Sequence, residues 1–474
     1  MFEDDPVTLV DAIASAGRAE SAAIARRLGA IAGLYRRRCR DYEEAQFWYT
    51  DVVEAVAAEV SAAQNISRDR AVPQVRQAVS LYQRLPEVGA VFARGDIDYR
   101  MVQVVITRTE NVLDEVIAEL DRSLAGVVHK WMRLSKPKLR DRIDMWVAEH
   151  DPAGVRVTPL VEDSRYVEVE PHPNAAGMAL IGGVLDAADA EAIDQRLDMI
   201  AESVCPNDPR SKRQRRAEAT GALGRLEATL ACRCGSPDCT AAAVGDSAAQ
   251  VVIHVLAEQK TVDGTGARPG YLSGFGVLPA ESVRRIAATA KIRPVRPPGT
   301  DAEKGYRPSA ALRDFVQWRD LTCRFPGCDR AVMGCDVDHT TPWPFGLTHP
   351  SGLKLYCRTH HLIKTFYTGP NGWKDQQRPD GSIVVTAPTG HVYVTEAFGG
   401  VLFPDLAAPT APITTTTPVE ADQRSAMMPM RATTREQDRR TRIRQERQRR
   451  LELDAELERQ HQARLAATYE PPPF

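Results

Sequence analysis

The segment Cys357-Arg358-Thr359-His360-His361-Leu362-Ile363-Lys364 (CRTHHLIK) places two adjacent histidines directly after a cysteine, in a chain with only ten histidines. Residues three apart on a helix share a face, so Cys357 and His360 can bind the same metal ion. Neighbouring residues on a helix point about 100° apart. His361 therefore faces a different direction and either serves a second site or is incidental.

A second pair of potential metal ligands lies upstream, in the segment CRFPGC that contains Cys323 and Cys328. Its Pro-Gly turn returns the two thiolates towards one point. Two short-spaced ligand pairs in one chain are typical of a closed tetrahedral zinc site, here with three cysteines and His360. The alternative is four unrelated buried residues. Cys335, alone in an apparent strand, is interpreted as a packing residue.

Between the two pairs lies CDVDH, in which Asp338 and His339 are adjacent. The segment is predicted to be a strand that runs into a loop. Side chains at a strand end can diverge around a shared pocket, although strand neighbours point to opposite faces. If His360 faces the zinc, His361 can meet Asp338 on the other side of a strand-to-helix unit.

Taken together, CRFPGC, CDVDH and YCRTHHLIKTF resemble the HNH endonuclease domain, which has a ββα-metal fold. From about residue 20 to 400 the chain is similar to the actinobacterial 13E12 repeat family, in which a helical domain of unknown function precedes a C-terminal HNH domain. The segments ACRCGSPDC and LSGFGVLPAESVRRIA resemble the middle region of that family.

The resemblance implies roles for the three polar residues. His339 would be the general base that takes a proton from the attacking water, as suits an imidazole near neutral pH. Asp338 and His361 would hold one catalytic Mg²⁺ or Mn²⁺, which would polarise the scissile phosphate of DNA. The zinc would be structural.

One position departs from the HNH pattern. The family usually has an Asn-Leu-x-x-Leu-Cys motif before the second ligand pair, whereas this chain has Gly352 at the place of the asparagine. The asparagine steadies the loop and helps to orient the base, so its loss would slow the reaction. His349 and Ser351 lie nearby in the sequence and are candidate substitutes.

Local charge favours a nucleic-acid partner. Eleven Lys and Arg against six Asp lie between Lys304 and Arg378, in a chain with a net charge of −2. The expected phosphate contacts would make DNA binding salt-sensitive and weakly sequence-specific; they are Arg324, Arg330, Lys354, Arg358 and Lys364. The alternative is that these residues form ordinary solvated faces.

A second cysteine cluster contains Cys232, Cys234 and Cys239 around a Gly-x-Pro turn. It predicts a second zinc site with Cys205 or His254 as the fourth ligand. A reduced cluster that only forms a turn is the alternative.

The predicted fold class is α+β, with four regions. Residues 1–153 form a helical bundle, 154–300 a mixed α/β region, 301–400 the HNH domain, and 401–474 a Pro/Thr linker and a charged helical tail. The N-terminus lacks the features of a secretory signal and no apolar run approaches membrane-spanning length, so the chain is expected to be cytoplasmic with no membrane partner.

The preferred function is a DNA endonuclease or nicking enzyme. The first alternative is a zinc-stabilised DNA-binding module that cleaves weakly or not at all, with Gly352 as the cause. A further alternative is a helical interaction protein that carries the HNH block as a passenger. The helical regions are candidates for homo-oligomer or protein contacts.

Overall fold

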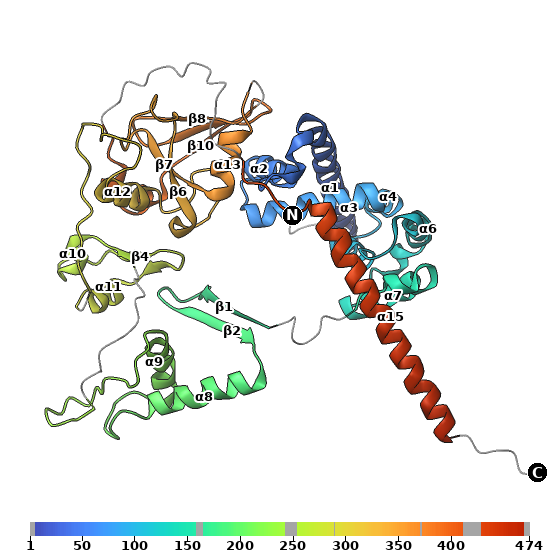
Figure 1. Ribbon diagram of the computed structural model, residues 1–474, viewed down its shortest axis with the longest axis horizontal. Helices are drawn as coiled ribbons and strands as arrows, with labels where there is room; N and C mark the ends of the chain where they lie inside the picture. The colour runs from blue at the N-terminus through green and yellow to red at the C-terminus, as the bar shows by residue number, and fades with distance from the viewer. Residues whose placement is uncertain are drawn as a thin grey trace, which may run out of the picture. The chain divides into compact units, whose positions relative to one another are not determined.

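The structure is a computed structural model that describes residues 5–157, 165–241, 254–288, 290–369, 372–410 and 428–468. The chain divides into two compact units: residues 1–158 together with 294–474, and residues 159–293. Figure 1 shows that helices dominate the N-terminal part of the first unit, as the sequence predicts. None of the helices in the described ranges combines the length and the apolar character that a bilayer crossing requires.

The helical bundle begins with a long helix whose Asp5 side chain caps its N-terminus. Its apolar faces pack into one core that includes Leu28, Val56 and Leu81, all fully buried. Its helices are α1 (Pro6–Asp41), α2 (Val52–Gln64), α3 (Arg68–Arg84), α4 (Pro86–Ala93), α5 (Tyr99–Arg108), α6 (Asp114–Ala125) and α7 (Lys136–His150), with short 3-10 turns η1 (Glu43–Phe47), η2 (Val128–Trp131) and η3 (Pro152–Gly154).

Two of the prolines in this region, Pro73 and Pro86, behave differently. Pro86 begins α4, where its missing N–H costs nothing. Pro73 lies inside α3 instead of ending a helix. It removes one backbone hydrogen bond there, and the helix continues because Val75, Ala78 and Leu81 are buried in the bundle core.

The C-terminal part of the first unit contains two small antiparallel sheets. One pairs β6 with β7, and the other has the order β10-β9-β8, in which β9 and β10 form a hairpin. The elements are α12 (Ala310–Asp320), η5 (Val332–Gly334), β6 (Cys335–His339), β7 (Leu353–Cys357), α13 (Arg358–Phe366), β8 (Lys374–Gln377), β9 (Ile383–Thr386), β10 (Val392–Thr395), α14 (Phe398–Leu402) and η6 (Pro404–Ala407).

A fully buried carboxylate, Asp320, connects these elements. It accepts hydrogen bonds of 2.8 Å from the side chains of Arg319 and Arg324 and from the backbone N–H of Leu355 in β7. Burial opposes its ionisation, but the two guanidinium groups outweigh burial and keep the pKa of Asp320 below its ordinary value. The end of α12 is thereby joined to the β6–β7 sheet.

The region around β6 and β7, here called the hairpin region, shares its core with the helical bundle. Cys323, Phe325 and Tyr356 belong to the same buried cluster as the helices. The Tyr367 hydroxyl donates to the backbone oxygen of Thr50, just before α2. These contacts make the two parts of the first unit one packed body.

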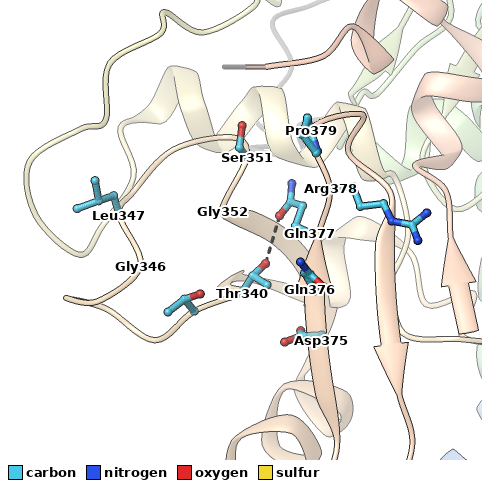
Figure 2. A pocket seen from close by; sticks show the side chains of 11 residues that line it. Thr340, Gly346, Leu347, Ser351, Gly352, Asp375, Gln376, Gln377, Arg378 and Pro379 are labelled. Carbon is cyan, nitrogen blue, oxygen red and sulfur yellow. Dashed lines mark hydrogen bonds between the residues drawn. The ribbon is translucent and has the colours of Figure 1, made fainter. Parts of the chain in front are cut away.

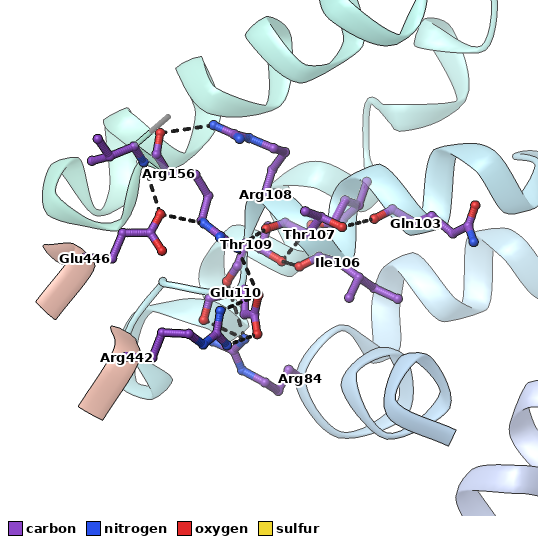
Figure 3. A network of polar contacts seen from close by, with 12 residues as sticks. Arg84, Gln103, Ile106, Thr107, Arg108, Thr109, Glu110, Arg156, Arg442 and Glu446 are labelled. Carbon is purple, nitrogen blue, oxygen red and sulfur yellow. Dashed lines mark hydrogen bonds and ion pairs between the residues drawn. The ribbon is translucent and has the colours of Figure 1, made fainter. Parts of the chain in front are cut away.

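The charged tail forms α15 (Arg435–Thr468), as predicted. Its first half is held against the bundle by ion pairs, part of which Figure 3 shows. Glu446 accepts a 2.6 Å hydrogen bond from Arg156, which also binds Glu110 at 2.9 Å, and Arg442 binds the same Glu110. The arginines of the tail are therefore partly neutralised within the chain.

The second unit contains the strands β1 (Tyr166–Pro171) and β2 (Ala179–Val184), which pair antiparallel. Its helices α8 (Ala187–Ala201) and α9 (Lys212–Gly224) pack on each other. A three-stranded sheet has the order β3-β4-β5; the remaining elements are β3 (Val255–Leu256), α10 (Gln259–Val262), β4 (Gly270–Leu272), β5 (Gly276–Leu278) and α11 (Ala280–Ala287). Most of the predicted Pro/Thr linker lies outside the described residues.

Candidate functional site

The candidate site is built on β6, β7 and α13. The two strands are antiparallel, with Asp338 opposite Lys354 and His339 opposite Leu353. Cys357 ends β7 and is also the N-cap residue of α13, so no loop separates strand from helix. The first helical turn therefore presents His360 and His361 directly beside the hairpin.

The four predicted zinc ligands converge. The ligand atoms of Cys323, Cys328, Cys357 and His360 all lie within 4.8 Å of one another. His360 Nδ1 is 3.3 Å from Cys357 Sγ and 3.5 Å from Cys323 Sγ. In a tetrahedral zinc site with ordinary bond lengths, sulfur and nitrogen ligands are about 3.6 Å apart. The cluster has the donors and the spacing to bind zinc, and Cys335 lies outside it.

The surroundings of this cluster fix its shape. The ring of Phe325 stacks on His360 at 4.0 Å with an interplanar angle of 6°. Gly327 has a φ of +79°, and a Cβ there would lie 2.6 Å from the Ser61 oxygen of α2. The turn of CRFPGC therefore requires glycine for its backbone and for its close approach to the bundle.

His361 lies between two carboxylates. Its Nδ1 is 2.9 Å from Asp336 Oδ2, and its Nε2 is 3.4 Å from Asp338 Oδ1. As the helical spacing predicts, the two histidines face different groups: His360 lies in the cysteine cluster and His361 lies beside Asp338. Asp336 was missed by sequence reasoning, although it lies two residues before Asp338 on the same face of β6.

Two lysines hold the other oxygen of Asp338. Lys354 Nζ and Lys364 Nζ lie 2.8 Å and 2.7 Å from Asp338 Oδ2, and Lys354 also binds Asp375 at 2.8 Å. Burial opposes ionisation of Asp338, but the two ammonium groups outweigh it and hold the pKa of Asp338 well below its usual range. Oδ1 remains on the side of His361.

His339 is buried, with 6% of its surface exposed. Its Nε2 is 3.0 Å from the Thr348 hydroxyl, and that hydroxyl donates its only proton to the backbone oxygen of Gly305 at 2.6 Å. The hydroxyl must therefore accept from Nε2–H, which leaves the lone pair of the neutral ring on Nδ1. Tyr306 stacks on the ring at 5.3 Å. Burial lowers the pKa of His339, so its neutral form is favoured.

The side-chain partner of His339 is Thr348, not one of the residues expected to replace the asparagine missing at Gly352. Neither His349 nor Ser351, the two candidate substitutes, supplies the side-chain partner of His339 among the described residues. Gly352 N–H donates to the His349 oxygen at 2.9 Å, and its carbonyl accepts from Thr340 N–H at 2.8 Å. Gly352 thus acts through its backbone, and sequence reasoning missed Thr348.

A pocket of about 260 Å³ opens beside Gly352 (Figure 2). Its lining comes from the loop between β6 and β7, from strand β8 and from the two residues after that strand: Thr340, Thr341, Gly346, Leu347, Ser351, Gly352, Asp375, Gln376, Gln377, Arg378 and Pro379. Asp375 connects this pocket to the lysine pair at Asp338.

The structure corrects the expectation for two of the five phosphate-contacting residues. Arg324 and Lys354 are buried, at 2% and 0% exposure, with their charges paired to Asp320 and Asp338. Desolvating a charge is costly without such partners. Both residues therefore form ion pairs inside the protein and do not face phosphate. Lys364 is also engaged with Asp338.

The other two predicted phosphate contacts are accessible. Arg330 is exposed, and 57% of the Arg358 side chain is accessible, 3.7 Å from Asp336.

The second cysteine cluster also forms. Cys205 joins Cys232, Cys234 and Cys239, with all four sulfur atoms within 4.8 Å of one another. Of the two candidates for the fourth ligand, the structure thus places Cys205 in the cluster. Both cysteine-rich clusters have donors suited to zinc.

Comparison with known proteins places the chain in a family. Residues 15–320 match the model "Domain of unknown function (DUF222)", and this match ends just before Cys323, the first cysteine of the Cys₃His cluster. The uncharacterized protein Rv2100 of Mycobacterium tuberculosis strain H37Rv is 41% identical over 478 residues, covering 92% of this chain and 86% of the relative. Rv3776 of the same strain is 40% identical over 473 residues, covering 94% and 90%. No solved structure matches. Since the family model covers well over half of the chain, the protein belongs to the DUF222 family.

Proposed function

We propose that this protein is an HNH-type, metal-dependent DNA endonuclease with a structural zinc. The observation that carries the proposal is the convergence of three groups on one hairpin and helix. The buried His339, the Asp338–His361 pair and the Cys₃His cluster all lie on or beside β6, β7 and α13.

His339 would act as general base through Nδ1. The Thr348 hydroxyl fixes Nε2 as the protonated nitrogen, so Nδ1 has the lone pair that can accept a proton from water. Tyr306 restricts the ring plane. A base held in this way spends more time in attack geometry, which is where positioning contributes to rate.

Asp338 Oδ1 and His361 Nε2 would hold a divalent cation, Mg²⁺ or Mn²⁺. Their separation of 3.4 Å is close to the edge of an octahedral site with bonds of 2.0–2.1 Å, about 3.0 Å. When bound, the ion would polarise the phosphate and offset charge on the leaving oxygen. Asp336 would orient His361 through Nδ1, a carboxylate–histidine arrangement common around metals.

Lys354 and Lys364 would keep Asp338 ionised and fixed. Their contacts on Oδ2 leave Oδ1 as the oxygen directed to His361. DNA would be contacted from the exposed Arg330 and Arg358, and such contacts predict an affinity that falls with salt. A cytoplasmic location belongs to this proposal, because the clusters need reduced thiols.

The test is a plasmid-nicking assay with Mg²⁺ or Mn²⁺, comparing wild type, His339→Ala and His391→Ala. His391 is an exposed histidine in the turn between β9 and β10, so its variant is a matched control. We expect nicking by wild type and the control, and none by His339→Ala. Absence of metal-dependent nicking, or nicking that survives His339→Ala, contradicts the nuclease proposal.

A second candidate is a zinc-stabilised DNA-binding module without cleavage activity. It is favoured by the two lysines that already neutralise Asp338 and by Gly352 at the position of the usual asparagine. Salt-sensitive DNA binding without nicking by the metal-loaded wild type would support this candidate over the enzyme.

A further inference from the structure

The cluster of Cys205, Cys232, Cys234 and Cys239 lies in the second unit, outside the proposed nuclease site. Cys205 follows α8, and the other three follow α9. The sulfur atoms of Cys205 and Cys232 are 3.4 Å apart. This separation is far beyond the roughly 2.05 Å of a disulfide. It is close to the sulfur–sulfur edge of a tetrahedral zinc thiolate site, about 3.8 Å.

The backbone around the cluster closes a tight loop. The Cys232 N–H donates to the Ala241 oxygen at 2.7 Å, and the Cys239 N–H donates to the Ser236 oxygen at 3.3 Å. Gly235, with a φ of +74°, allows the left-handed turn between Cys234 and Ser236. This loop carries three of the four sulfur atoms.

A buried ion pair joins the two segments that carry the cysteines. The Arg210 guanidinium binds the Asp208 carboxylate at 2.9 Å and 2.7 Å and donates to the Ala231 oxygen at 2.8 Å. Asp208 also accepts the backbone N–H of Arg233 at 2.8 Å. The loop after α8 is thus fixed against the loop after α9, which preorganises the four sulfur atoms.

The apolar core at this place is small. The buried cluster between α8 and α9 consists, within the described residues, of Ile200, Ala201, Ala219, Ala222 and Leu230. Three of these five are alanines, which contribute little buried apolar area. Cores of this size ordinarily need a covalent or metal cross-link to stay folded.

We propose that Cys205, Cys232, Cys234 and Cys239 bind a zinc ion as a closed tetrathiolate, and that this ion holds α8, α9 and their loops folded. Four soft thiolates select zinc over Mg²⁺ or Mn²⁺. Four protein ligands fill a tetrahedral ion, so the site is structural rather than catalytic. Because the unfolded chain does not hold the four sulfur atoms together, zinc binds the folded form preferentially, and its affinity supplies part of the folding free energy of this region.

Zinc content per chain tests the proposal on the purified full-length protein. Cys205→Ser should contain one zinc ion fewer than wild type, whereas Cys39→Ser, outside both clusters, should not differ. Cys205→His should retain the ion, because imidazole can replace one thiolate. Cys323→Ser reports separately on the first cluster, so failure of the proposed nuclease site leaves this result unaffected. Equal zinc in wild type and Cys205→Ser overturns the proposal.

Hydrogen exchange on wild type covers the case in which the serine variant does not fold. Removal of zinc with a chelator should raise exchange in α8 and α9, and zinc added back should restore protection. Helices α5 and α7 of the bundle, which pack on each other, serve as the internal reference. Unchanged exchange in α8 and α9, or fewer than nine titratable thiols in the denatured protein because disulfides have formed, would overturn the metal assignment.

Discussion

The Thr348–His339 contact gives the sharpest prediction. Replacing Thr348 with Val keeps the side-chain shape but removes the hydroxyl that accepts from Nε2–H. Both side chains are buried, at 1% and 6% exposure, so water does not readily replace the lost partner. A buried donor without an acceptor costs about 1–3 kcal/mol. If that cost is added to the activation free energy of nicking, the nicking rate drops about 5- to 160-fold.

The ring can avoid this cost only by moving its proton to Nδ1, which removes the lone pair of the proposed base. Either outcome slows nicking. Thr348→Ser is the matched control, since it keeps the hydroxyl that serves both His339 and the Gly305 oxygen. We expect its rate to remain near that of wild type. Thermal unfolding, measured on both variants, separates a loss of stability from a loss of rate.

The assay is single-turnover plasmid nicking across pH. Burial lowers the pKa of His339 below 6.5, so the acid limb of the wild-type rate profile should lie below pH 6.5. Activity should be lost as pH falls through this lowered pKa, because the base becomes protonated. The reasoning is refuted if Thr348→Val cuts at the wild-type rate while His339→Ala is inactive. It is also refuted if the serine variant is as slow as the valine variant, since the methyl group would then matter and not the hydroxyl.

Three further predictions follow from the same region. Asp320→Asn leaves two buried guanidinium groups without their carboxylate and should cost about 3–5 kcal/mol in denaturant unfolding, whereas the exposed Asp329→Asn should cost little. Because the pKa of Asp320 is lowered from 3.8 in the fold, its stabilisation should be complete above pH 3.8 and lost as pH falls through the lower folded value, measured as unfolding midpoint against pH. Asp336→Asn should raise the Mg²⁺ or Mn²⁺ concentration for half-maximal nicking about 10- to 100-fold; an unchanged value would remove its proposed role in orienting the metal ligand. Gly352→Asn should fold with a shift of a few tenths of an ångström, since its Cβ would lie 3.2 Å from the Leu347 oxygen and 3.7 Å from the His349 oxygen; a faster nicking rate would show that the missing amide limits catalysis.

The sequence determined the parts of the site that depend on local spacing. Cys357 and His360 share a face because they are three residues apart on a helix, and the Pro-Gly turn of CRFPGC brings Cys323 and Cys328 together. The same helical geometry turned His361 towards Asp338. The helical N-terminal region and the charged helical tail followed from composition and periodicity.

Only the tertiary structure decided which charges are buried. Arg324 and Lys354 are basic residues near the site in sequence, but partners from other elements draw them into the interior. Exposure depends on packing between distant segments, which local charge counts do not contain.

The partner of His339 and the fourth ligand of the second cluster were decided in the same way. Thr348 reaches His339 through a loop conformation fixed by Gly305, and Cys205 lies 27 residues before Cys232. Spacing identifies ligands within one turn of helix or one tight turn, because backbone geometry fixes their separation there. Across longer separations, many chain paths are compatible with the sequence, and packing of the whole unit selects the one that closes the site.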